Sequence, residues 1–424
     1  MTRARDLADS ADKDIVGTIT VDGLTVAGNV SVDGGTIKLD GNYPVANNNV
    51  ALGNFALDDG SLSGNANTAL GSSSMTANTS GQKNVAVGES AMLSSTTGSF
   101  NAALGQDSLN GNTTGSYNVA IGSQSLLSNT TASNNTAVGY QSLYANTSSN
   151  NTAFGNLAAK NATTATGLVI VGREAGRDLT TGSENTALGY DAMQKTTTGA
   201  SNVGLGFRAL FSNTTASYNT AVGNKAGYSN TTGQLNTAIG NDALYFNTTG
   251  YENVVVGANA LNQNTTGAFN TAIGRQALGL NTTASNNTAV GYQAGYSNTT
   301  GVSNVAFGSL ALYLNTGGDE NVAVGREAMY SNTTASGNIA VGRRALYVNT
   351  TGANNVSLGF ESLRYNTTAS NNTAVGYQAG YSNTTGTIIT ALGRQALYAN
   401  TTGTNNTAVG YAMVSNTTGS NNTG

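Results

Sequence analysis

The side chains that could carry out chemistry in this chain are few. The 424-residue sequence contains no Cys and no His, and charged residues make up only 9% of it. Thiolate nucleophiles, Ser-His-Asp triads, imidazole bases, disulfides and Cys- or His-based zinc sites are therefore excluded. The 21 acidic residues show no recurrent pairing that would suit general acid–base catalysis. We predict no enzyme activity, no metal site and no cofactor.

Tyrosines at a constant spacing are the most regular candidates for ligand contact. Four of them follow one another at intervals of 17 residues: Tyr296, Tyr313, Tyr330 and Tyr347. Aromatic columns can stack on sugar rings, but they also stabilise stacked strands by themselves. A glycan-contact column and a purely structural column both remain open.

These tyrosines belong to a repeat that runs through most of the chain. The unit Asn-x-Ala-φ-Gly-x-x-Ala, in which φ is Val, Ile, Leu or Phe, recurs every 17 residues from Asn151 to Asn406, with Leu168 and Ile389 in place of Asn. Two departures from this spacing occur earlier. The step from Asn49 to Asn67 is one residue longer, and the step from Asn135 to Asn151 is one residue shorter. We count 22 repeats over residues 49–424, followed by a partial one.

The positions within the repeat differ sharply in character. Counting from the leading Asn, the fourth position is always apolar, the fifth is always Gly, and the third and eighth are almost always small. The sixth and seventh positions vary most and hold most of the charge, which suits either a binding face or a solvated edge. The fifth-position glycines should lie at bends where a Cβ would clash or φ must be positive; examples are Gly223, Gly240, Gly257, Gly274 and Gly291.

The repeat length predicts an all-β fold. Seventeen residues are too few for a helix pair, and the apolar pattern lacks a period of 3.6 residues. Two short strands, at positions one to four and seven to ten, would fit with tight turns at the Gly and at Asn-Thr-Thr-Gly. Stacked units would pair their backbones with the coils above and below, giving a parallel β-solenoid or β-roll of about 22 coils, roughly 100 Å long.

A single roll of this thickness would bury little apolar area. The fourth and ninth positions supply its large apolar side chains, and the small third- and eighth-position residues would permit close packing between chains. We therefore expect a homotrimeric rod. The alternative is that the small residues fill a narrow interior within one chain.

The repeat resembles two known families. Asn-x-Ala-φ-Gly-x-x-Ala/Ser is similar to the head repeats of trimeric autotransporter adhesins, which are left-handed parallel β-rolls. The longer form, as in residues 287–301, looks even more like repeat regions of bacteriophage tail fibres. The resemblance covers residues 49–424 and implies a structural protein of the virion, used in host recognition and adhesion.

The beginning of the chain favours the tail-fibre resemblance. Residues 1–20 are the most charged stretch, lack the apolar core of a secretory signal, and resemble fibre N-termini that dock onto the phage tail or baseplate. Residues 21–48 read as a β-structured neck with Asp-Gly turns. The resemblance places virion attachment at Arg3, Arg5, Asp6 and Leu7.

The expected partners follow from these interpretations. They are two further copies of the chain, phage tail or baseplate proteins, host surface glycans or proteins, and a separate distal tip protein, since the chain stops within a repeat. We expect no nucleic-acid binding and no membrane insertion, because the net charge is −4 and no apolar run approaches 20 residues. An extracellular or cell-surface adhesive filament is the first alternative. An ice-binding solenoid, suggested by the paired Thr columns, is the second.

Overall fold

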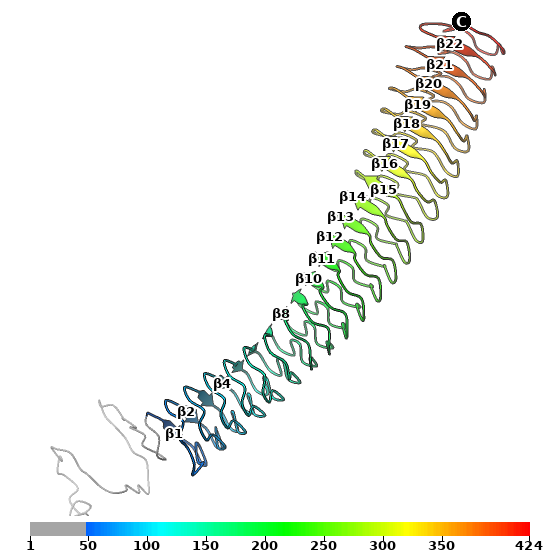
Figure 1. The fold of residues 1–424 in the computed structure, drawn as a ribbon. Coiled ribbons are helices and arrows are strands. Elements are labelled where there is room, and N and C mark those ends of the chain that lie inside the picture. The colour runs from blue at the N-terminus through cyan, green and yellow to red at the C-terminus, as the bar shows by residue number, and fades with distance from the viewer. Residues whose placement is uncertain (1–47) are drawn as a thin grey trace, which may run out of the picture. The chain divides into compact units, whose positions relative to one another are not determined.

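The computed structural model describes residues 48–424, which form a rod of stacked coils (Figure 1). Each repeat contributes one coil and one strand of three residues, at positions two to four. The strands form a single 22-stranded sheet. Their bounds are β1 (Val50–Leu52), β2 (Thr68–Leu70), β3 (Val85–Val87), β4 (Ala102–Leu104), β5 (Val119–Ile121), β6 (Thr136–Val138), β7 (Thr152–Phe154), β8 (Val169–Val171), β9 (Thr186–Leu188), β10 (Val203–Leu205), β11 (Thr220–Val222), β12 (Thr237–Ile239), β13 (Val254–Val256), β14 (Thr271–Ile273), β15 (Thr288–Val290), β16 (Val305–Phe307), β17 (Val322–Val324), β18 (Ile339–Val341), β19 (Val356–Leu358), β20 (Thr373–Val375), β21 (Thr390–Leu392) and β22 (Thr407–Val409).

Successive strands pair in parallel and in register, so equivalent repeat positions lie beside one another. Ala221 of β11, for example, pairs with Ala238 of β12. The shortened repeat keeps this register, because Thr136 of β6 still pairs with Thr152 of β7. The predicted parallel β-solenoid with a 17-residue period is confirmed. The predicted segments 1–20 and 21–48 lie outside the described residues, apart from residue 48.

The expected second strand, at positions seven to ten, does not form in residues 48–424. Positions seven and nine adopt left-handed backbone conformations, with φ of +52° at Lys225 and +54° at Leu244. A strand requires φ near −120°, so this part of each coil turns tightly instead. Its backbone still bonds to the next coil, as where the N–H of Leu244 donates to the carbonyl of Ala260 at 3.0 Å.

The interior of the rod is narrow and partly polar. The third, eighth and ninth positions point inward; Ala238, Ala243 and Leu244 of one coil are each at most 2% exposed. The Asn residues at the first and twelfth positions are buried as well. Asn247 shows their arrangement, since its Nδ2 donates to Oδ1 of Asn230 in the preceding coil at 2.8 Å. Columns of amide hydrogen bonds therefore flank a thin apolar core.

The fifth-position glycines meet the backbone of the next coil. The five glycines named from the sequence as bend residues have φ between +129° and +136°. A Cβ added to any of them would lie 2.5–2.7 Å from the carbonyl group of the following glycine in the series. Both the backbone conformation and the coil spacing therefore require glycine there. They are Gly223, Gly240, Gly257, Gly274 and Gly291.

Candidate functional site

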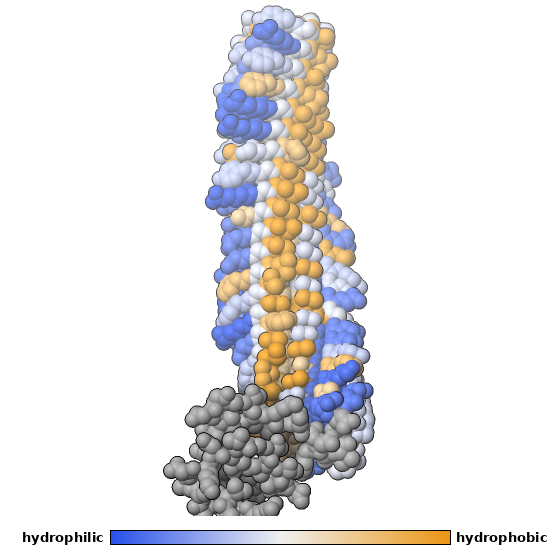
Figure 2. Space-filling model, turned by 90° about the vertical axis from the view of Figure 1, so that its left-hand side faces the viewer, coloured by the Kyte–Doolittle hydropathy of each residue, from blue (hydrophilic) through white to orange (hydrophobic). Residues whose placement is uncertain are grey.

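An apolar column runs along the outside of the rod. Because the third position of each strand points inward, the second and fourth positions point outward. The fourth position is apolar in every coil; Leu188 is 50% exposed and Phe307 is 54% exposed. Figure 2 shows this column over the length of the rod. We call it the apolar column: Leu52, Leu70, Val87, Leu104, Ile121, Val138, Phe154, Val171, Leu188, Leu205, Val222, Ile239, Val256, Ile273, Val290, Phe307, Val324, Val341, Leu358, Val375, Leu392 and Val409.

This arrangement corrects the assignment of inward and outward positions. The pattern of the repeat favours the small third and eighth positions for contacts between chains, with the fourth and ninth positions as the large apolar side chains of the coil. In the structure the third and eighth positions fill the interior of a single chain, and the fourth faces outward. The reason is space: leucine or methionine at position nine already occupies the narrow interior, so only small side chains fit opposite it.

The four tyrosines of the predicted column do stack on one another. The ring centroids of Tyr296 and Tyr313 are 5.5 Å apart, those of Tyr313 and Tyr330 are 5.1 Å apart, and those of Tyr330 and Tyr347 are 5.3 Å apart. The interplanar angles are 11° to 25°. Both faces of Tyr313 and Tyr330 are therefore covered by neighbouring rings. A sugar can reach the edges of these two rings but cannot stack on their faces.

Charged side chains continue the column beyond Tyr347. The guanidinium of Arg364 lies 6.0 Å from the ring centroid of Tyr347 and 5.8 Å from that of Tyr381. It also forms an ion pair with Glu361 at 2.8 Å. The charged side chains of Glu361 and Arg364 thus stabilise the column of stacked tenth-position aromatic rings, instead of facing solvent freely.

Two further ion pairs, both made by Glu327, lie beside the tyrosines. Glu327 is bridged by Arg326 and Arg344, and Arg344 in turn lies over the ring of Tyr347. Burial raises the pKa of the Glu327 carboxyl, but the hydrogen bond and charge of Arg344, with a smaller contribution from Arg326, outweigh burial and lower the pKa. Glu327 therefore stays ionised, and its ion pair holds Arg344 against the ring of Tyr347.

Stacking also affects the ionisation of the tyrosines. Burial raises the pKa of Tyr330, and Tyr313, Tyr347 and Glu327 raise it further by opposing a phenolate charge. We expect NMR of ring-labelled tyrosine to show Tyr330, assigned with a Tyr330→Phe variant, ionising above the ordinary tyrosine pKa. A neutral Tyr330 then stabilises the folded state fully at any pH below the ordinary tyrosine pKa. This stabilisation is lost as the pH rises through the raised pKa that Tyr330 has in the folded protein. An unshifted titration would contradict the stacked arrangement.

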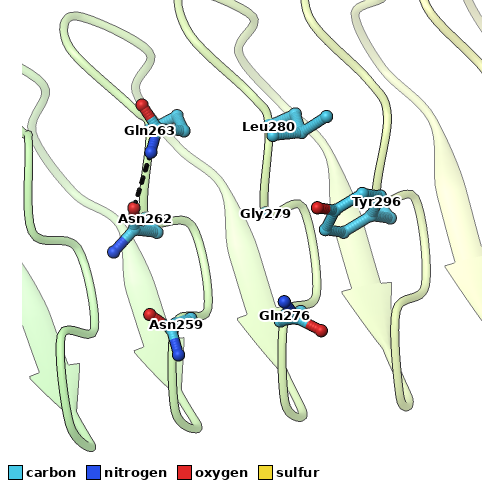
Figure 3. Close-up of a pocket in the computed structure, with 7 residues that line it drawn as sticks. All are labelled: Asn259, Asn262, Gln263, Gln276, Gly279, Leu280 and Tyr296. Atoms are coloured by element: carbon cyan, nitrogen blue, oxygen red, sulfur yellow. Dashed lines mark hydrogen bonds between the residues drawn. The ribbon is translucent and has the colours of Figure 1, made fainter.

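A notch interrupts the tenth-position column on the N-terminal side of Tyr296. Phe211, Tyr228 and Tyr245 stack at 5.1 and 5.0 Å, but the next two coils carry Asn262 and Gly279 instead of aromatic residues. The notch is a cavity of about 220 Å³ that spans three coils (Figure 3). Its lining residues are Asn259, Asn262, Gln263, Gln276, Gly279, Leu280 and Tyr296.

Sequence reasoning missed the notch, although a signal for it was present. The tyrosine series stops for two consecutive repeats, and amide side chains occupy the variable seventh position of the same coils. Reading the tenth position as a column with a gap, instead of as a run of tyrosines, would have found it. The complete set of lining residues could be identified only from the structure, because Asn259 and Gln276 are 17 residues apart and come together only when the coils stack.

The paired threonines occupy bends and not strands. The hydroxyl of Thr231 donates to the carbonyl of Thr248 at 2.9 Å, and that of Thr248 donates to Thr265 at 3.0 Å. The first threonines of these pairs are therefore bonded to the backbone of the next coil. The second, such as Thr249, is exposed. A single exposed column at a bend offers a narrower array than a flat threonine face.

The remaining predicted positions add no chemistry within the described chain. Arg3, Arg5, Asp6 and Leu7 lie outside residues 48–424. Within that range no three acidic side chains gather into a group that could hold a metal ion. The same range contains no helix able to cross a membrane.

Comparison with known proteins gives no family for the chain. No family model matches it, and neither the curated proteins nor the solved structures include a match.

Proposed function

We propose that this chain is a non-enzymatic structural protein of a phage tail fibre, forming an elongated homotrimeric rod that serves host recognition and adhesion. The observation that carries the proposal is the apolar column. A soluble monomer seldom exposes an apolar patch larger than a few hundred Å², whereas here an apolar side chain faces outward from each of 22 strands. A rod of this kind needs a partner along its whole length.

Further copies of the same chain are the partner that fits. Any occupant must present apolar groups at the same axial interval over roughly 100 Å, at about 4.8 Å per coil. A second copy lying parallel meets this requirement automatically. In a closed threefold arrangement each column faces the axis and contacts the columns of both partners, so that all three are covered. The polar and aromatic faces then remain on the outside for adhesion.

Charged substitutions in the apolar column test the assembly. We expect light scattering to give the mass of three chains for the unmodified protein. Combining Ile239→Glu, Ile273→Glu and Phe307→Glu should yield the mass of one chain, because glutamates would be buried without partners at the axis. These side chains point outward, so the coil itself should persist by circular dichroism.

The matched control places the same charges on another exposed column. Thr249→Glu, Thr266→Glu and Thr300→Glu lie on exposed bends of comparable coils, and this variant should keep the three-chain mass. A single-chain mass for the unmodified protein would overturn the trimer. Dissociation of the control would show that added charge alone separates the chains.

The location in the virion needs its own experiment. Antibodies against residues 49–424 should label tail fibres in electron micrographs and reduce adsorption to host cells. Deletion of residues 1–40 should abolish incorporation into virions; normal incorporation would overturn the attachment role of the N-terminal segment. Labelling of a cell surface instead of a virion would favour the adhesive-filament alternative. Thermal hysteresis would favour the ice-binding alternative, for which the exposed threonine column is the supporting observation.

A further inference from the structure

At the notch no aromatic ring of the described chain covers the N-terminal side of Tyr296. The rings of Tyr296, Tyr313 and Tyr330 are each covered on their C-terminal side by the next tyrosine of the column. On its N-terminal side Tyr296 meets only Gly279, whose missing side chain brings the ring close to the backbone: an added Cβ would lie 2.8 Å from Cε2 of Tyr296. At the other end of the gap Phe246 packs edge-on against Tyr245, with the ring centroids 4.6 Å apart.

The walls of the notch are amides with unused hydrogen-bonding groups. Gln263 Nε2 donates to Asn262 Oδ1 at 2.8 Å, and Asn262 Nδ2 donates to the carbonyl of Asp242 at 3.0 Å. Gln293 Nε2 donates to Gln276 Oε1 at 3.0 Å. These bonds orient the amides. Within residues 48–424 they leave Gln276 Nε2, Gln263 Oε1 and the whole amide of Asn259 without a protein partner.

We propose that this notch binds one neutral sugar ring of a surface glycan. The proposal rests on the adhesive role proposed above and names its ligand class and position. No charged side chain lines the notch, so phosphates and carboxylates find no counter-charge. Hydroxyl groups both donate and accept, which matches the free N–H and C=O groups of the amides. The ring of Tyr296, which lines the notch, supplies an apolar surface against which the C–H groups of a pyranose pack.

The size and position of the notch agree with this ligand. A cavity of about 220 Å³ is smaller than the usual sites for drug-sized ligands, which suits a single ring of a longer chain. The residues that line the notch lie on the same side of three neighbouring coils (Figure 3). Three equivalent notches in a trimer would convert weak single contacts into firm attachment.

Filling the notch tests the proposal. Gly279→Tyr places a side chain in the gap, and Gly279 has no positive φ that would disfavour one. Its Cβ would lie 2.8 Å from Cε2 of Tyr296, so the ring of Tyr296 has to shift to make room. The probes are the methyl glycosides of glucose, galactose, mannose and N-acetylglucosamine, observed by saturation-transfer NMR. We expect at least one to bind the unmodified protein, and Gly279→Tyr to weaken it about tenfold or more, with the circular dichroism spectrum of the rod retained.

Two further variants make the result decisive. Gln276→Leu removes one amide without filling the cavity and should also weaken binding. Leu127→Tyr adds a tyrosine at the equivalent position of a distant coil, next to Tyr144, and should leave binding unchanged. Absence of binding by every probe, or unchanged binding to Gly279→Tyr and Gln276→Leu, would overturn the site, as would tighter binding of glucuronate than of the neutral probes.

The failure of this inference is distinguishable from failure of the tail-fibre role. A three-chain rod that labels virion fibres but binds none of the probes refutes the notch alone. A protein that binds a probe at the notch but never labels virions refutes the fibre role alone.

Discussion

Replacing Gly240 by alanine is expected to break the rod locally, with a loss of about 3 kcal/mol or more. At φ of +135° an L-residue is strained by about 1–3 kcal/mol. The new methyl group would also lie 2.7 Å from the carbonyl carbon and oxygen of Gly257, and such overpacking costs a similar amount. Guanidinium denaturation measures the loss in stability. Hydrogen exchange should locate it in the coils next to Gly240, because coils contact only their neighbours.

Gly317 provides the matched control for this substitution. It belongs to the same kind of coil, has no positive φ, and an added Cβ would approach only the hydroxyl of Thr300 at 3.3 Å. Most other coils carry Thr at this position. Gly317→Ala should therefore change stability by less than about 0.5 kcal/mol. Equal losses for Gly240→Ala and Gly317→Ala would refute the steric argument, since it predicts a strong dependence on position.

The repeat made the architecture predictable but left the facing of the strands undecided. A constant 17-residue spacing, a constant Gly and turn-forming Asn-Thr-Thr-Gly indicate stacked coils directly. In Ala221-Val222, by contrast, two apolar residues are adjacent, and alternation along a strand allows either to point inward. The width of the interior decides which of the two residues points inward. That width depends on the ninth-position side chains, such as Leu244, which enter the interior from the opposite wall of the coil.

Local backbone conformation was the other feature that the sequence did not reveal. Lys225 and Leu244 have side chains that usually disfavour a positive φ. Their residue types therefore do not predict a left-handed turn. The conformation is imposed by stacking, because each turn forms hydrogen bonds to the coils on both sides. The notch is hidden for the same reason: its walls come from three coils, and only their alignment places Asn259, Gln276 and Tyr296 together.

Replacing the buried Asn253 by leucine is expected to cost about 2 kcal/mol, although the two side chains are similar in size. Oδ1 of Asn253 accepts the backbone N–H of Asn270 at 3.0 Å, and its Nδ2 donates to the carbonyl of Gly267 at 2.9 Å. Leucine would leave the buried N–H of Asn270 without this acceptor, a penalty of about 1–3 kcal/mol. The added apolar burial would offset part of this penalty. Chemical denaturation of both proteins measures the difference.

The chain itself limits how large this effect can be. Leu168 and Ile389 replace Asn in two coils, so the N–H groups of Asn185 and Asn406 face a side chain that has no oxygen, and the strands on either side still pair. One interruption is therefore tolerated, and Asn253→Leu should weaken the rod without unfolding it. Asn241→Leu, on the exposed sixth position of a neighbouring coil, is the control and should be nearly neutral. If both variants lost equal stability, the amide column would have no special part in holding the coils together. A loss confined to Asn253→Leu would identify these buried hydrogen bonds as the polar counterpart of the thin apolar core.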